Sequence, residues 1–210
     1  YKFQFHKGRN YCMESMINDF IINQFGKSLE LKQAIYNSKN IGMVVREVSL
    51  AIVKAYKNGN KTIIAGNGGS AADAQHIAGE FVSRFYFDRP GLASIALTTD
   101  TSVLTAIGND YGYEKIFVRQ LQANGKAGDV FLGISTSGNS KNIIEALKYA
   151  RENNILTVGL TGENGGLMKN ICDYCICMPS NETPRIQEGH ILIAHTICAV
   201  VEEFIFGKGF

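Results

Sequence analysis

Hydrophobic residues follow two patterns along this chain, helical spacing and short continuous runs, and the changes between the patterns mark the predicted helices and strands. From Met13 to about Lys57 they recur at helical spacing, and a polar run over 37–40 splits this stretch into two helices. Beyond it, short apolar runs alternate with helical patterns. Short runs that are rich in β-branched residues and bounded by glycine or polar turns indicate buried strands.

The alternating part of the chain predicts five strands and the helices between them. Strands alternating with helices form a parallel sheet covered on both faces, so we predict an α/β three-layer sandwich. The two leading helices carry more apolar surface than one sheet face needs, and this excess predicts packing against another subunit. The strands are expected over residues 62–65, 93–97, 129–134, 155–160 and 174–178. The later helices are expected over 102–107, 113–122, 141–152, 165–172 and 184–206, with a loop over 108–112.

Composition and charge narrow the class of protein. The chain has 210 residues, of which 45% are hydrophobic and 19% charged, which suits one globular domain. The net charge of +2 is too small to indicate nucleic acid or an anionic membrane as a partner. No uninterrupted apolar run approaches the ~20 residues of a membrane helix. Residues 1–12 are aromatic and basic without the apolar core of a signal peptide, and we interpret them as an extension or tag remnant before a single domain over 13–210.

Five cysteines, an odd number, occur without a secretory signal, which predicts reduced thiols and a cytoplasmic protein. The spacing Cys172-x-x-Cys175-x-Cys177 allows a zinc site, but no second ligand pair follows nearby. Because residues 174–178 alternate like a strand, we favour thiols that serve as small apolar side chains.

A glycine-rich turn, Gly66–Ser70, follows the first strand and opens a helix. Glycines let the backbone approach a ligand closely, and the N-terminus of a helix offers unpaired N–H groups to an anion. The turn matches neither G-x-x-x-x-G-K-[ST] nor G-x-G-x-x-G, which argues against a nucleoside triphosphate and a dinucleotide. A phosphorylated small molecule is the predicted ligand.

A second polar turn, Ser135–Ser140, follows another strand and is rich in hydroxyl groups. Ligands of open parallel sheets bind at the carboxyl ends of the strands, where both turns are expected. One hydroxyl would suffice to cap the next helix, so four of them favour a phosphate cradle. Asn109 and Asp110, in the predicted loop, could reach a sugar hydroxyl, although loops carry polar residues for other reasons.

The helix after the glycine turn carries His76 and Glu80 four residues apart, on one face. An imidazole beside a carboxylate suits a metal site or proton transfer, but a solvated helix face would show the same spacing. On the last helix, Gln187 and His195 share a face with Cα atoms about 12 Å apart. Both could ligate one ion only if their side chains leaned toward it from either side. Considered by itself, His195 could equally be a histidine of the hydrophobic core.

These motifs together resemble the phosphoheptose isomerase branch of the sugar isomerase (SIS) domain family. The resemblance runs from about Lys61 to Glu203 and includes the two leading helices in kind, so that a single SIS domain is expected over 13–210. Pro184 departs from the small residue that many members carry there, and we expect it to stiffen the start of the helix and shift Gln187 slightly. The matching segments are Gly66–Glu80, Gly108–Asp110, Ile134–Ser140, Arg185–Glu188 and His195.

The resemblance implies a five-stranded parallel sheet, a homotetramer with active sites between subunits and one zinc ion per subunit. The implied reaction converts sedoheptulose 7-phosphate to D-glycero-D-manno-heptose 7-phosphate, the first step toward ADP- or GDP-heptose for lipopolysaccharide or capsule. The implied acid and base are Glu80 and His195. The implied metal ligands are His76, Glu80, Gln187 and His195. The implied substrate contacts are Asn67, Gly68, Gly69, Ser70, Asn109, Asp110, Ser135, Thr136, Ser137, Ser140 and Gln187.

The chemistry of a ketose–aldose exchange agrees with these residues. Moving a proton between adjacent carbons through an enediol needs a carboxylate near the carbons and a second acid–base group for the oxygens. Two alternatives stay open. A related protein binds the bacterial replication initiator without catalysis. Sequences of that type lack the acidic residue that corresponds to Glu80 and the histidine that corresponds to His195. Other enzymes of this fold act on amino-sugar phosphates, and the set Glu80, Gln187 and His195 argues against them.

Overall fold

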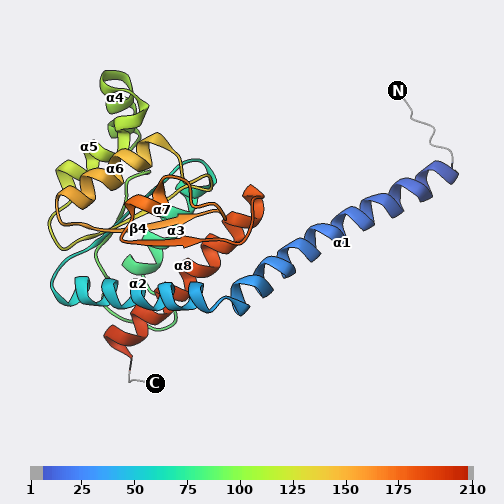
Figure 1. The fold of residues 1–210 in the computed structure, drawn as a ribbon, viewed down its shortest axis with the longest axis horizontal. Coiled ribbons are helices and arrows are strands. Elements are labelled where there is room, and N and C mark those ends of the chain that lie inside the picture. Colours follow the sequence, from blue (N-terminus) through green and yellow to red (C-terminus); the bar gives the residue numbers. More distant parts are fainter. Residues whose placement is uncertain (1–6, 208–210) are drawn as a thin grey trace.

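Five parallel strands form one sheet in the order β2-β1-β3-β4-β5 in the computed structural model, which describes the backbone of residues 7–207 and the side chains of residues 13–207 (Figure 1). The register pairs Ile64 of β1 with both Ala96 of β2 and Leu132 of β3. The predicted five-stranded parallel sheet is therefore confirmed. The strands are β1 (Thr62–Gly66), β2 (Ser94–Ala96), β3 (Val130–Ile134), β4 (Leu156–Thr161) and β5 (Tyr174–Cys177).

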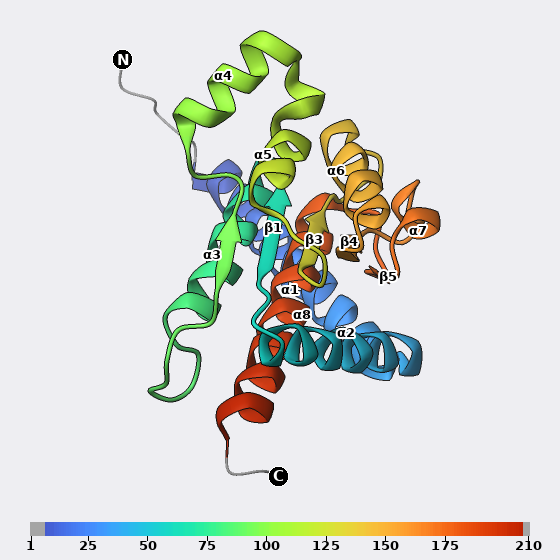
Figure 2. The same ribbon diagram turned by 90° about the vertical axis from the view of Figure 1, so that its left-hand side faces the viewer.

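Helices cover both faces of the sheet, as the three-layer prediction requires (Figure 2). Successive residues of a strand point to opposite faces. Ile64 accordingly packs with α2, α3 and α8, whereas Ile63 packs with α5, α6 and α7. The helices are α1 (Lys7–Asn37), α2 (Lys39–Lys57), α3 (Gly69–Val82), α4 (Thr101–Tyr111), α5 (Ile116–Asn124), α6 (Lys141–Glu152), α7 (Met168–Ile171) and α8 (Thr183–Phe206), with a 3₁₀ turn, Tyr113–Lys115, before α5.

Local signals explain where several helices begin and end. The predicted break over 37–40 falls at Ser38, whose hydroxyl accepts a hydrogen bond from the N–H of Ile41 (3.3 Å) and caps α2. The predicted loop over 108–112 is wrong, because α4 continues to Tyr111. Asp100 caps that helix, Gly108 is tolerated inside it, and Gly112, at φ 91°, ends it.

The predicted helix over 165–172 is shorter in the structure, where only Met168–Ile171 are helical. Gly165 and Gly166 have φ values of 74° and 54°, which a right-handed helix cannot contain. The strand prediction for 174–178 is confirmed by β5, and the described cysteines Cys172, Cys175, Cys177 and Cys198 are free thiols.

Among the described residues, α8 is the one helix long and apolar enough to cross a membrane by length and composition. Its surroundings are those of a core helix. Ile193 and Ile197 are buried against α2 and the sheet, and the polar residues His190 and Glu202 are buried with hydrogen-bond partners. We therefore interpret its apolar composition as core packing.

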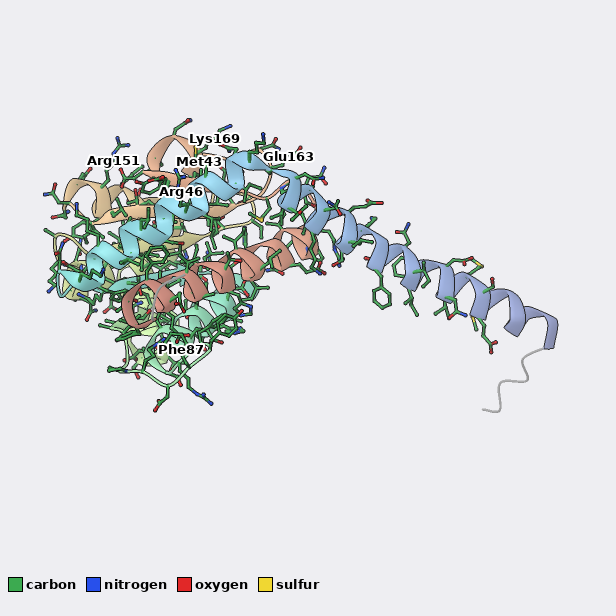
Figure 3. All side chains as sticks on the ribbon, turned by 90° about the horizontal axis from the view of Figure 1, so that it is seen from below. Met43, Arg46, Phe87, Arg151, Glu163 and Lys169 are labelled. Atoms are coloured by element: carbon green, nitrogen blue, oxygen red, sulfur yellow. The ribbon has the colours of Figure 1, made fainter. Side chains whose placement is uncertain are left out.

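The N-terminal part of α1 projects away from the body of the molecule as a single helix (Figure 3). Only its last turns, including Leu31 and Ile35, join the core. An apolar surface of this extent is typical of an interface. The expected boundary at residue 13 falls inside this helix, and residues 1–6 of the expected extension lie outside the described residues. The exposed apolar side chains are Met13, Met16, Ile17, Phe20, Ile21, Ile22, Phe25 and Leu29.

Candidate active site

The glycine turn lies at the carboxyl end of β1 and opens α3, as predicted. Gly68 precedes the helix with φ 56° and ψ −121°, a conformation that favours glycine. A Cβ at Gly66 would overlap the backbone carbonyl of Ser70, so the turn is too tight for a side chain there. The N–H groups of Ser70 and Ala71 donate to the carbonyls of Asn67 and Gly68 (3.0 Å each) and close the turn. An anion at this helix start would therefore use the N–H groups of Gly68 and Gly69.

Asn67, in this turn, is held by two other residues. Its Nδ2 donates to Asn142 Oδ1 (2.9 Å), and its Oδ1 accepts from Asn142 Nδ2 (2.8 Å) and from the hydroxyl of Tyr113 (3.0 Å). Both lone pairs of Oδ1 are thus used, and one N–H of Asn67 remains for a ligand oxygen. Asn142 was missed by sequence reasoning, although a polar residue on the buried face of α6 was a usable signal.

The serine turn lies beside the glycine turn, because Gly66 pairs with Ile134 at the ends of β1 and β3. Its hydroxyls converge: Ser135 Oγ is 2.8 Å from Ser140 Oγ and 3.4 Å from Ser137 Oγ. A hollow of about 260 Å³ joins the two turns, and the exposed Lys141 brings a positive charge to it. Glu114 lines the same hollow with the opposite charge, so a phosphate there would depend on hydroxyl and N–H donors rather than on net positive charge. The lining residues of the hollow are Asn67, Tyr113, Glu114, Ser140, Lys141 and Asn142.

Asn109 and Asp110 lie on the last turn of α4 rather than in a loop. Both are exposed, and Asn109 Nδ2 donates to Asp110 Oδ1 (2.8 Å). Neither lines the hollow between the turns, nor a second one of about 380 Å³ on the other side of Asn67. Their expected contact with substrate stays a prediction.

Three side chains from α3 and α8 meet at one point. His76 Nε2 lies 3.0 Å from Glu80 Oε1 and 3.2 Å from His195 Nε2. The ring centroids of the two histidines are 4.9 Å apart, and Phe85 packs 5.5 Å from the His195 ring. Residues 119 positions apart in the chain thus converge, and His195 is no isolated core histidine.

The donor set of this cluster fits a zinc ion. Its three ligand atoms all lie within 4.8 Å of one another. Two imidazoles and one carboxylate form a ligand set of catalytic zinc sites, which keep a further position open. Two Nε2 atoms 3.2 Å apart form a hydrogen bond only if one carries a proton, whereas a cation would use both lone pairs.

Gln187 lies at the other end of the same pair of helices. A Cβ at Gly69 would overlap the amide nitrogen of Gln187, so this amide rests directly on the glycine turn. From Gly69 to His76 the helix rises about 10 Å. The structure therefore places Gln187 beside the expected phosphate site, and its role as a fourth metal ligand stays a prediction that requires its side chain to swing toward His195.

We predict that Gly69→Ala lowers kcat/KM about 10-fold by displacing the Gln187 amide from the turn. Gly79→Ala, in the same helix, is the matched control, because a Cβ there meets no atom within 4 Å. Steady-state kinetics of both variants check the prediction. Equal kcat/KM in the two variants would show that the contact with Gln187 has no part in activity.

His190 is a buried histidine five residues before His195 on α8. Its Nε2 lies 3.1 Å from the carbonyl oxygen of Thr161, and burial lowers its pKa from 6.5 to about 4. As the pH falls below about 6.5, His190 therefore becomes protonated in the unfolded chain but stays neutral in the folded chain until the pH approaches 4. The difference corresponds to about 3 kcal/mol of unfolding free energy, present above pH 6.5 and lost toward pH 4.

We predict that His190→Gln, which keeps an N–H donor but does not titrate, flattens the dependence of stability on pH between 6.5 and 4. Denaturant unfolding at several pH values measures this effect. Acidic residues contribute equally to the pH dependence of stability in the wild type and the variant. Parallel curves of unfolding free energy against pH would therefore contradict the assignment to His190.

Comparison with known proteins agrees with this geometry. The sequence model of the SIS domain matches residues 30–162. Phosphoheptose isomerase 2 of Campylobacter jejuni is 64% identical over 92% of this chain and 96% of that protein. The phosphoheptose isomerase of Aneurinibacillus thermoaerophilus is 62% identical over 92% and 98%. The structure of a phosphoheptose isomerase from Neisseria gonorrhoeae has a TM-score of 0.84 and 41% identity, covering 89% of this chain and 99% of that one.

The chain therefore belongs to the SIS domain family. Within that family, its curated relatives at this level of identity are phosphoheptose isomerases, which it matches over nearly their whole length.

Proposed function

We propose that this chain interconverts sedoheptulose 7-phosphate and D-glycero-D-manno-heptose 7-phosphate, as a ketose–aldose sugar-phosphate isomerase. The observation that carries the proposal is the convergence of Glu80 and His195 from two helices on one point. The names of the relatives support the substrate. A non-catalytic protein that binds the replication initiator finds no support among these relatives.

Each part of the site has a role in this reaction. The N–H groups that open α3 and the hydroxyls of Ser135–Ser140 bind the phosphate and orient the sugar. Glu80 moves the proton between the two carbons, and His195 exchanges protons with the sugar oxygens. Asn67 directs its remaining N–H at a ligand oxygen.

His76, Glu80 and His195 would hold one zinc ion per subunit, with Gln187 as the expected fourth ligand. When bound, the metal polarises the carbonyl and stabilises negative charge on the neighbouring oxygens. The residues of the chain still perform the proton transfers.

An assay of the purified, zinc-loaded protein with a panel of sugar phosphates tests the proposal. We expect isomerisation of sedoheptulose 7-phosphate and no turnover of glucosamine 6-phosphate. Turnover of the amino sugar alone would instead support another enzyme of this fold. We also place the protein in the cytoplasm, where its sugar phosphates and reduced thiols belong, and expect its product to enter heptose synthesis for surface glycans.

We propose that α1 assembles the protein into a homotetramer. Phe20 and Phe25 are each 66% exposed on this helix, and an aspartate at both positions would place two charges in the apolar surface. We predict that this double variant elutes as a smaller species in light-scattering chromatography. Leu167→Asp, at an exposed apolar residue outside α1, is the control. An unchanged mass of the double variant would contradict the role of α1.

A further inference from the structure

An ion pair between Arg89 and Glu202 is buried where the C-terminal end of α3 meets α8. Arg89 Nε donates to Glu202 Oε1 (2.8 Å), and the two side chains are only 2% and 1% exposed. Arg89 lies in the segment that joins α3 to β2, and Glu202 lies on α8. Neither residue belongs to the substrate or metal residues described above. Because buried charges are retained only when they are paired and hydrogen-bonded, the contacts of this pair reveal what it holds.

The guanidinium of Arg89 binds the end of the helix that carries Glu80. Its Nη2 donates to the carbonyl of Glu80 itself (2.8 Å), and its Nη1 donates to the carbonyl of Phe81 (2.6 Å). The last carbonyls of a helix have no partner within the helix. Arg89 supplies these partners and so fixes the backbone from which the Glu80 carboxylate extends.

The carboxylate of Glu202 holds the segment that contacts His195. Glu202 lies seven residues after His195, on the same face of α8. Its oxygens accept the backbone N–H groups of Phe85 (2.8 Å) and Tyr86 (2.6 Å), and the Phe85 ring packs against the imidazole of His195. Burial opposes ionisation of Glu202, but these hydrogen bonds and Arg89 hold its pKa below the usual range.

We infer that Arg89 and Glu202 are positioning residues that set the separation between Glu80 and His195. Arg89 fixes the backbone of Glu80. Glu202, which lies on the same helix as His195, fixes the segment of Phe85, whose ring packs against the imidazole. This inference rests on the proposed function for its catalytic consequence, but its effect on the metal-binding cluster is independent of the substrate.

The variants Glu202→Gln and Arg89→Lys test the pair. Glutamine keeps an acceptor oxygen without the charge, and lysine keeps the charge without the fork of donors that reaches Glu80 and Phe81. We expect both to weaken zinc affinity about 10–100-fold, measured on metal-free protein by competition with a chelator, as happens when outer-shell partners of metal ligands are lost. For sedoheptulose 7-phosphate we expect kcat to fall, whereas KM changes little because the phosphate turns lie at the other end of α3.

A second buried ion pair provides a matched control. Asp129 is fully buried, accepts from Lys61 Nζ (2.6 Å) and accepts the backbone N–H groups of Lys61 and Lys126. It lies directly before the central strand β3, at the amino ends of the strands, and its hydrogen-bond partners are Asn60, Lys61 and Lys126 rather than residues of α3 or α8. Asp129→Asn should lower the melting temperature as the Glu202 variant does but leave zinc affinity and kcat unchanged.

The outcomes separate the possible roles. Weakened zinc affinity in both Arg89 and Glu202 variants, with normal affinity in the Asp129 variant, supports the inference. Lower melting temperature with zinc affinity and kcat equal to those of the control would overturn it and leave the pair a purely structural one. If no protein, including the wild type, turned over sedoheptulose 7-phosphate, the proposed function would fail while the affinity measurement still decided the role of the pair.

Discussion

Replacing Glu80 by glutamine is expected to lower the turnover of sedoheptulose 7-phosphate by about 10²–10⁴-fold, the usual range for loss of a general acid or base. Glutamine has nearly the same shape and can still hydrogen-bond to His76, but it cannot accept a proton from carbon. The phosphate turns are unchanged, so binding of the sugar phosphate should persist. Turnover is measured by following the two isomers directly, and binding by calorimetry with the inactive variant.

Glu80 is also an expected metal ligand, and the zinc content of the variant separates the two effects. Loss of turnover in a variant that still holds zinc assigns the loss to proton transfer. Glu152→Gln, at an exposed carboxylate at the end of α6, is the control and should behave as wild type. Wild-type turnover in Glu80→Gln would refute the role of this residue.

Removing the metal is expected to lower turnover by about 10²-fold or more, because loss of several kcal/mol of charge stabilisation has that effect on a rate. His76→Asn should produce the same loss, since it removes one of the three converging ligand atoms. Zinc should restore the chelator-treated wild type but not this variant at matched concentration. Turnover after dialysis, with and without added zinc, is the measurement.

Gln75→Ala is the matched control for His76→Asn, because Gln75 is its exposed neighbour on the same helix. This control should recover with zinc as the wild type does. Full turnover of the metal-free wild type would show that the cluster acts without a metal, through its imidazoles and carboxylate alone.

Periodicity and turn chemistry were sufficient to predict the sheet and the two polar turns at the carboxyl ends of β1 and β3. The Gly66–Ser70 turn could be predicted because a strand, glycines and a helix follow one another within a few residues. The loop prediction at 108–112 failed because an internal glycine weakens a helix without ending it. Spacing placed His76 beside Glu80, but only the packing of α3 against α8 brings His195 to them.

The residues that hold the site in place were not predictable from local pattern. Asn142 acts on Asn67 across 75 positions, and Arg89 reaches Glu202 across 113. Such contacts depend on which elements become neighbours in the folded chain. A charged residue in a connecting segment, such as Arg89, looks the same in the sequence whether it is solvated or buried.

If α1 assembles the protein as proposed, its projecting part links the stability of the protein to its concentration. A helix that packs on nothing of its own chain has little to hold it in water, because most helical stability in proteins comes from packing of the apolar face. In the proposed homotetramer its exposed apolar residues would pack against neighbouring copies, so ordering of this segment and association would be one mass-action equilibrium. Dilution should therefore lower the melting temperature of the whole molecule, and a more concentrated solution should raise it.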